Sequence, residues 1–218
     1  MSSRQQEKER RRQERQAAEQ AAARSASRKR RLRLGGAALL IAAVGAAIAV
    51  VALAGGGGDD EPDQTAFAAD ARAAGCTFNA YRSEGRDHTS GKVRYRTNPP
   101  TSGRHNPVPA QDGIYQPGNE PAPENAVHSL EHGRVLYQYK PGTPEADVRK
   151  LRALAEEEFN GSPGYHTLLF QNNTRMTAQF ALTSWTKSLT CNRLTPESED
   201  VMREFRRLYT DKAPEFIP

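Results

Sequence analysis

The feature that most constrains this chain is an unbroken run of uncharged residues from 34 to 54. The run is 21 residues long and consists of Ala, Gly, Val, Leu and Ile. As a helix rising about 1.5 Å per residue it would be about 31 Å long, which matches the roughly 30 Å hydrocarbon core of a bilayer. We therefore expect residues 34–54 to form a transmembrane helix in contact with membrane lipid.

A cleavable signal peptide is the alternative interpretation of this run. Ala52-Leu53-Ala54 resembles a small-residue cleavage site. Against cleavage, 33 residues precede the run, and the apolar segment of a signal peptide is usually only about 7–15 residues long. We favour an uncleaved, single-pass signal anchor.

The charge distribution predicts which side of the membrane each part occupies. Residues 1–33 contain twelve basic and four acidic residues, a net charge of +8, whereas the remaining residues sum to −3. By the positive-inside rule the basic tail is cytoplasmic and the main domain extracytoplasmic. The tail is expected to lie near anionic lipid headgroups at the cell membrane rather than to bind nucleic acid.

The part beyond the apolar run divides into a stalk and a domain. Residues 55–75 begin with four glycines followed by acidic residues, which predicts a flexible stalk. Residues 76–218 are numerous enough for one domain with its own core. The two cysteines, Cys76 and Cys191, both lie on the predicted outer side, where disulfides persist. We predict that they form a disulfide, the alternative being that one thiolate ligates a metal.

Hydrophobic periodicity predicts a loop-rich α+β domain. The first part, about 76–125, is dense in Pro, Gly and Asn and is expected to form loops, with 92–96 a candidate strand. The order after it is strand, helix, strand, strand, helix. Strands are predicted at 134–139, 165–170 and 177–185, with one helix after Thr143 and another after Thr195. Each Thr is a predicted N-cap followed by Pro, and both helices should cover one face of a small sheet.

Four of the five histidines, His88, His105, His128 and His132, fall between residues 88 and 132. Imidazole is the commonest metal ligand in proteins. His128 and His132 can share an ion only if 128–132 is helical, because residues four apart lie about 13 Å apart along a strand but about 6 Å apart on a helix. The pattern predicts a metal site with His105, His128 and His132 as ligands, completed by His88 or Glu131. Nitrogen donors favour zinc or copper.

Two other interpretations stay open. In the first, the histidines and Glu131 form hydrogen bonds that support a loop-rich fold, in a module that binds an unknown protein partner. Alternatively, residues 128–132 match the H-x-x-E-H pattern of a class of zinc peptidases, in which Glu131 would activate water as the catalytic base. The only candidate third acids are the run at 156–158. Other catalytic motifs are missing, so we do not expect an enzyme.

Five short motifs follow one another along the chain. They are Pro-Pro-Thr-Ser-Gly-x-His at 99–105, Gly-x-Tyr at 113–115, Val-His-Ser-Leu-Glu-His-Gly at 127–133, Ala-Leu-Thr-Ser-Trp at 181–185 and Ala-Pro-Glu at 213–215. Together they resemble the bacterial family catalogued as domain of unknown function 3105, over about 75–215. The resemblance implies a membrane-anchored protein with its domain outside the cytoplasm, and it implies a histidine near His88. It implies no reaction, and His166 matches none of its motifs.

Overall fold

The computed structural model describes residues 63–215 and 217, which belong to a single compact unit of the chain. The helices are α2 (Gln64–Ala73), α3 (Pro123–Glu131), α4 (Glu145–Glu156) and α5 (Pro196–Tyr209). The strands are β1 (Cys76–Ala80), β2 (Gly113–Ile114), β3 (Val135–Tyr139), β4 (Glu158–Phe159), β5 (Ser162–Pro163), β6 (Thr167–Gln171), β7 (Phe180–Ser184) and β8 (Lys187–Cys191). The predicted α+β class is confirmed.

A mixed sheet of six strands forms the centre of the domain, in the order β1-β8-β7-β3-β6-β2. From β1 to β3 the neighbours are antiparallel, whereas β3, β6 and β2 run parallel. The parallel step from β3 to β6 is made by a crossover that contains α4, as parallel neighbours require. The predicted core order of strand, helix, strand, strand, helix corresponds to β3, α4, β6, β7 and α5.

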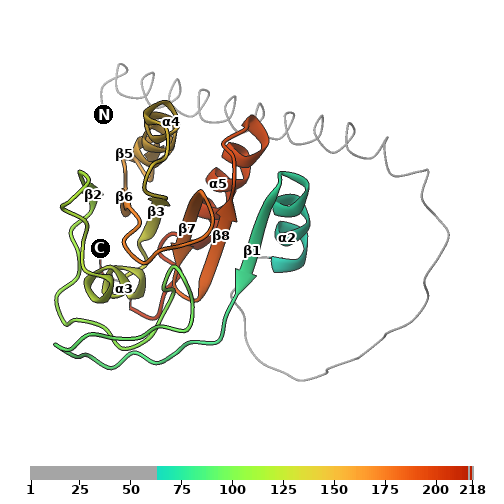
Figure 1. Cartoon of the computed structure of the whole chain (residues 1–218). Helices are drawn as coiled ribbons and strands as arrows, with labels where there is room; N and C mark the ends of the chain where they lie inside the picture. The colour runs from blue at the N-terminus through green and yellow to red at the C-terminus, as the bar shows by residue number, and fades with distance from the viewer. Residues whose placement is uncertain (1–62, 216, 218) are drawn as a thin grey trace, which may run out of the picture. The chain divides into compact units, whose positions relative to one another are not determined.

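The sheet has a hydrophobic core on each face, because its central strands are buried on both sides. In β3, Val135, Tyr137 and Tyr139 face α4 and α5, and Leu136 faces α3. Figure 1 shows α3 on the opposite side of the strands from α4 and α5. The prediction that the helices cover one face is therefore incomplete, because α3 and the long loop before it cover the second face.

The predicted stalk at 55–75 requires a correction. Within it, residues 64–73 form α2, whose Phe67 and Ala71 are buried in the first core. The Asp63 carboxylate caps this helix by accepting from the backbone N–H groups of Thr65 and Ala66, which satisfies two of the free donors at a helix start. The Phe67 ring packs edge-on against Phe78 of β1 at 5.0 Å between centroids. These contacts anchor the segment in the domain.

Three smaller predictions are also corrected. Residues 92–96 do not form a strand, and β1 and β8 were not anticipated. Thr143 is not the N-cap of α4, because its hydroxyl donates to the Lys140 carbonyl and Pro144 takes the cap position. Thr195 does cap α5, and it exchanges hydrogen bonds with Ser198 in a capping box.

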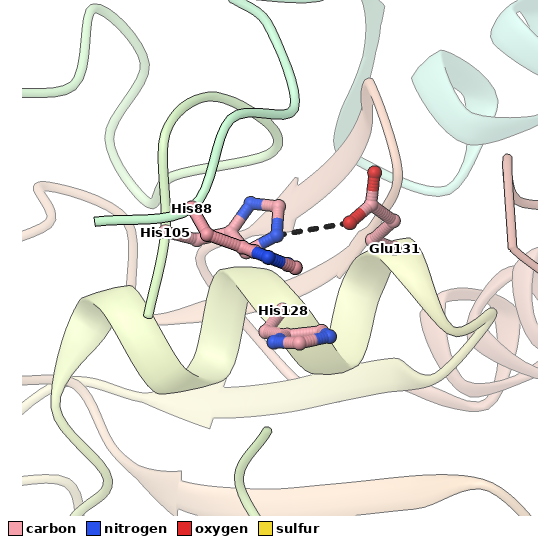
Figure 2. A group of neighbouring side chains, drawn as sticks. All are labelled: His88, His105, His128 and Glu131. Atoms are coloured by element: carbon pink, nitrogen blue, oxygen red, sulfur yellow. Dashed lines mark ion pairs between the residues drawn. The ribbon is translucent and has the colours of Figure 1, made fainter. Parts of the chain in front are cut away.

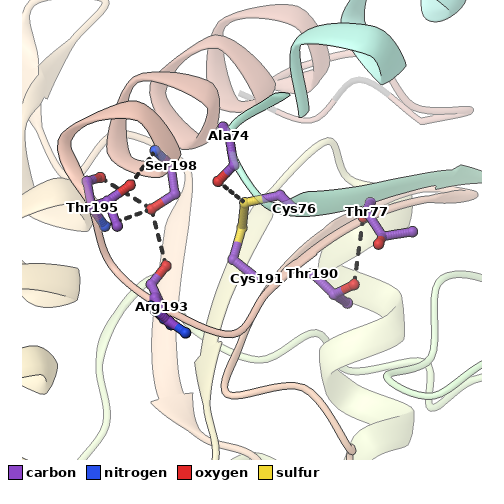
Figure 3. Close-up of a disulfide and its surroundings, with 8 residues drawn as sticks. All are labelled: Ala74, Cys76, Thr77, Thr190, Cys191, Arg193, Thr195 and Ser198. Carbon is purple, nitrogen blue, oxygen red and sulfur yellow. Dashed lines mark hydrogen bonds between the residues drawn. A yellow bond between two sulfur atoms is a disulfide. The ribbon is translucent and has the colours of Figure 1, made fainter. Parts of the chain in front are cut away.

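The predicted disulfide is confirmed. Cys76 and Cys191 lie directly opposite each other at the ends of β1 and β8, with their Cα atoms 4.4 Å apart. That separation is typical of an antiparallel pair without mutual backbone hydrogen bonds. Figure 3 shows the bridge close to the start of α5, where Ser198 donates to the Arg193 carbonyl. The disulfide therefore ties edge strand β1, and α2 with it, to the interior of the sheet.

The predicted transmembrane run at 34–54 and the basic tail at 1–33 lie outside the described residues. Among the helices that are described, none has the length and apolar character to cross a bilayer.

The disulfide closes a loop between residues 115 positions apart, so its reduction should lower the free energy of unfolding by about 2–5 kcal/mol. The measurement is urea unfolding of the full-length chain with and without reductant, followed by the fluorescence of Trp185, the single tryptophan, which is buried. A Cys76→Ser/Cys191→Ser double variant is the control and should be insensitive to reductant. Equal midpoints for the oxidised and reduced chain would contradict the prediction.

Candidate metal centre

Helix α3 presents two chemically different faces. Ala126, Val127 and Leu130 pack on the sheet, whereas His128 and Glu131 point to the other side. Pro123 occupies the first turn, where its missing N–H costs nothing. His132 is the C-cap residue and Gly133 follows with φ +80°, a conformation that favours glycine. The helical geometry that a shared ion requires of residues 128 and 132 is therefore present.

The loop between β1 and β2 brings the other two histidines to this helix. Apart from a two-residue bridge, its fully described residues 81–112 form neither helix nor strand. The bridge joins His88 to His105, with the Thr89 N–H donating to the His105 carbonyl at 2.7 Å. The loop is pinned to α3 by the buried Glu124 carboxylate, which accepts from the Val93 N–H at 3.0 Å.

His88, His105, His128 and Glu131 converge, and we call them the inner set. Each offers one ligand atom, and these atoms all lie within 4.8 Å of one another. Figure 2 shows the His88 and His105 rings above α3, the His128 ring projecting from the helix below them, and the Glu131 carboxylate beside His105. The ring centroids of His88, His105 and His128 are 4.8–5.0 Å apart in each pair. Only His88 is exposed.

Hydrogen bonds to backbone carbonyls fix the tautomers of two of these rings. His105 Nδ1 lies 2.8 Å from the Gly103 carbonyl oxygen, and His128 Nδ1 lies 2.6 Å from that of Asn106. A carbonyl only accepts, so both Nδ1 atoms carry hydrogen and both Nε2 atoms of the neutral rings present a lone pair. This carbonyl contact is the usual orienting partner of a metal-bound histidine.

The lone pair of His105 faces a carboxylate. His105 Nε2 is 2.9 Å from Glu131 Oε2, and both side chains are at most 1% exposed. The contact lacks hydrogen-bond geometry, and His105 Nε2 and Glu131 Oε1 have no hydrogen-bond partner among the described residues. The nearest cation is the half-exposed Arg86, whose Nε is 3.6 Å from Glu131 Oε1. Two buried acceptors therefore face each other.

Burial shifts the ionisation of the cluster towards neutral forms. It lowers the pKa of His128, with help from the neighbouring histidines, and it lowers the pKa of His132, with help from Arg134. It raises the pKa of Glu131, against the opposing effect of His105. Neutral imidazole is the form that binds a metal, so His128 and His132 are ready to act as ligands near neutral pH.

A second group, which we call the outer set, consists of His128, His132 and Glu215. His128 Nε2 is 2.8 Å from His132 Nε2, which is 3.5 Å from Glu215 Oε2. The four predicted ligands are thus divided between the two sets. His88, His105 and His128 meet in the inner set, whereas His132 belongs only to the outer set; His128 is a member of both. Their role as metal ligands stays a prediction. The sequence analysis did not predict Glu215 as a ligand. Its place in the Ala-Pro-Glu motif at 213–215 was the signal that could have pointed to it.

The remaining candidates lie elsewhere. His166 Nδ1 is 2.6 Å from Asp211 Oδ1, outside both sets. Glu156 pairs with Arg152 and Glu157 with Arg203, so two of the three proposed distant acids already have exposed partners. Glu215 is the acid that reaches the histidines of the H-x-x-E-H pattern. However, Glu131, which the pattern would use as a base, lies against His105 instead.

Gly133 holds the C-terminal segment against α3, because its carbonyl accepts from the Asp211 N–H at 2.9 Å. A Cβ on Gly133 would lie 2.8 Å from Asp211 Cα. Gly133→Ala should therefore cost about 1–2 kcal/mol for its left-handed φ and about 1–3 kcal/mol more for the clash. Urea unfolding followed by Trp185 fluorescence measures both.

Gly161 is the matched control, since its φ is +82° and a Cβ there meets nothing within 4 Å. Gly161→Ala should show only the first cost. If the two variants lost the same free energy of unfolding, the backbone at Asp211 would have moved to accommodate the new methyl group, which would contradict the predicted clash.

Comparison with known proteins gives one match. A family model described as a protein of unknown function, DUF3105, matches residues 88–216, more than half of the chain. Neither a curated protein nor a solved structure matches significantly. The matched range contains every residue of the inner and outer sets. The chain belongs to the DUF3105 family, for which no activity is described.

Proposed function

We propose that this domain is a binding module for a zinc or copper ion, tethered outside the cytoplasm by a single-pass membrane anchor. The observation that carries the proposal is the contact between His105 Nε2 and Glu131 Oε2, two buried acceptors 2.9 Å apart. Such an approach is repulsive unless a cation joins the two atoms. A metal ion or a proton can fill that role.

Several features favour the metal ion. A proton would need a directed hydrogen bond, and the contact does not have that geometry. A buried carboxylate is costly unless it is paired and hydrogen-bonded, and an ion bound by both residues removes that cost. The carbonyl bonds at His105 Nδ1 and His128 Nδ1 aim both Nε2 atoms away from the backbone, as in histidine metal sites.

The donor set suits zinc or copper. Three imidazole nitrogens and one carboxylate oxygen match the ligands of these ions better than the all-oxygen sites of magnesium or calcium. Ligand atoms of a tetrahedral zinc site with bonds near 2.0–2.1 Å lie about 3.3 Å apart. The inner set, within 4.8 Å, reaches that separation by side-chain shifts of about 1 Å.

Binding is favoured over hydrolysis because the inner set uses its only acid as a ligand. A hydrolytic site needs a free base beside a metal-bound water. Glu131 is at most 1% exposed and lies against His105, so as a ligand of the ion it is not free to take a proton from a metal-bound water. The proposed module therefore retains or delivers an ion.

The proposed location is supported by sequence features and by the disulfide. The uncharged run at 34–54 and the +8 tail before it predict an anchor in contact with lipid and anionic headgroups, with the domain outside. The Cys76–Cys191 bridge is of the kind that persists in oxidising compartments.

The purified full-length chain should bind one equivalent of Zn²⁺ or Cu²⁺, measured by elemental analysis and by calorimetric titration. Structural zinc sites contribute about 10–16 kcal/mol over four ligands. Loss of one ligand should therefore cost about 3 kcal/mol, so His105→Gln should weaken binding about a hundredfold. His166→Gln, which removes a similarly buried imidazole outside both sets, should leave the affinity unchanged.

Two results would reject a metal-binding role. One is the lack of any stoichiometric ion after purification and after titration with both metals. The other is that His105→Gln and His166→Gln lower the melting temperature equally and neither changes the metal content, which would make the histidines structural.

The anchor is tested by fractionation of a bacterial host that expresses the full-length chain. The chain should sediment with membranes, resist extraction at alkaline pH, and have its domain digested by protease added outside spheroplasts. Deletion of residues 1–54 should abolish membrane association. Recovery of the intact full-length chain in the soluble fraction would contradict the proposed location.

A further inference from the structure

The outer set lies beside the inner set but differs in accessibility. In the outer set, the Glu215 side chain is 44% exposed and that of His132 is 11% exposed. In the inner set, His88 is exposed, whereas His105 and Glu131 are at most 1% exposed. Glu215 is held in place by its backbone N–H, which donates to the Glu131 carbonyl at 3.1 Å. Nearby, Arg134 donates to the Ile217 carbonyl at 2.6 Å. A cation arriving from solvent on this side meets Glu215 first.

The two sets share a single nitrogen. His128 belongs to both, and its Nδ1 is committed to the Asn106 carbonyl at 2.6 Å. Its Nε2 is therefore the one atom that it can offer to an ion. Without metal, His132 Nε2–H can donate to this lone pair at 2.8 Å. One lone pair binds one ion, so occupation of one set removes a ligand from the other.

We infer that the outer set is a second metal station, in which His128, His132 and Glu215 capture a divalent transition-metal ion and pass it to the inner set. The transfer is an exchange of ligands around His128: the ion keeps His128 Nε2, loses His132 and Glu215, and gains His105, Glu131 and His88. This inference rests on the proposed function and adds a route to the same site. It requires one ion per chain, never two.

Ligand number determines which station holds the ion at equilibrium. The inner set offers four protein ligands and the outer set three. Structural metal sites usually have four protein ligands, whereas a site with three keeps an open position for water. The inner set should therefore retain the ion and the outer set exchange it. Removal of one inner ligand leaves three ligands in each set, so removal of two should reverse this preference.

The test is titration of the full-length chain with Co²⁺, whose visible absorption spectrum depends on its ligands. Wild type should bind one equivalent, and Glu215→Gln should change the dissociation constant less than about twofold and leave the saturated spectrum unchanged. In a His88→Ala/His105→Gln background, which leaves two inner ligands against three outer ones, the ion should occupy the outer set. There, Glu215→Gln removes a direct ligand, so it should weaken binding about a hundredfold and alter the spectrum. Glu158→Gln, an exposed carboxylate outside both sets, should have no effect in either background.

His88→Ala/Glu131→Gln provides a second background, because it keeps His105 and also leaves only two inner ligands. The same dependence on Glu215 should appear there if the first background fails to fold. An equal effect of Glu215→Gln in the wild-type and ligand-deficient backgrounds would overturn the second station. So would two equivalents of Co²⁺ in wild type. Both results leave the inner site standing, whereas a wild-type chain that binds no Co²⁺, Zn²⁺ or Cu²⁺ rejects the proposed function itself.

Discussion

The packing of α3 against the sheet is the interaction on which the histidine cluster depends. Val127 and Leu130 are at most 1% exposed, and burial of such side chains stabilises by about 1.5–3 kcal/mol each. Because these residues fix the rotation of the helix about its axis, His128 and Glu131 must point away from the sheet. A helix of nine residues is too short to be stable alone. The cluster therefore exists only where the second core has formed.

The long loop opposite α3 is the other half of the site, and polar contacts replace regular structure in it. The buried Glu124 carboxylate binds the Val93 N–H, and the Ser102 hydroxyl accepts from the Glu84 N–H. Thr101 accepts from the Thr186 N–H and so attaches the loop to the hairpin between β7 and β8. Buried polar groups need such partners, which explains why a segment without helices or strands can hold His88 and His105 in place.

The elements predicted from the sequence are those with a clear hydrophobic pattern, and the elements that were missed have a weaker one. The amphipathic stripe of α5 and the apolar runs of β3, β6 and β7 were sufficient to identify them. The hairpin to β8 turns at Trp185 and Thr186, with Thr186 at φ 61°, and neither residue is a typical turn former. Helix α2 follows a glycine run, and only the spacing of Phe67 and Ala71 indicated its buried face. The disulfide was predictable because the chain has two cysteines and an expected outer side.

The site was predictable in its residue types but not in its division. Helical spacing places His128 beside His132, yet nothing in the spacing shows which loop histidine approaches from which side. The contact of His132 with Glu215 joins residues 83 positions apart through the turn at Gly133. Such non-local geometry is set by tertiary packing, which a local pattern does not encode. The predicted ligands, His105, His128 and His132 with His88 or Glu131, therefore fall into two adjacent groups.

The contact between His105 and Glu131 can be compared with another acid–histidine pair in the same domain. This second pair consists of the buried His166 and the partly buried Asp211. The two are 2.6 Å apart with hydrogen-bond geometry, and Asp211 also accepts from the Tyr165 hydroxyl. The Asp211 carboxylate oxygens and His166 Nδ1 all have hydrogen-bond partners, as expected of a pair with a structural role. In the inner set, His105 Nε2 has a carboxylate at 2.9 Å but no hydrogen bond, in a more deeply buried place. If the histidines served stability alone, both pairs would be expected to have the satisfied form, so the difference between them is better explained by a ligand-binding role for the inner set.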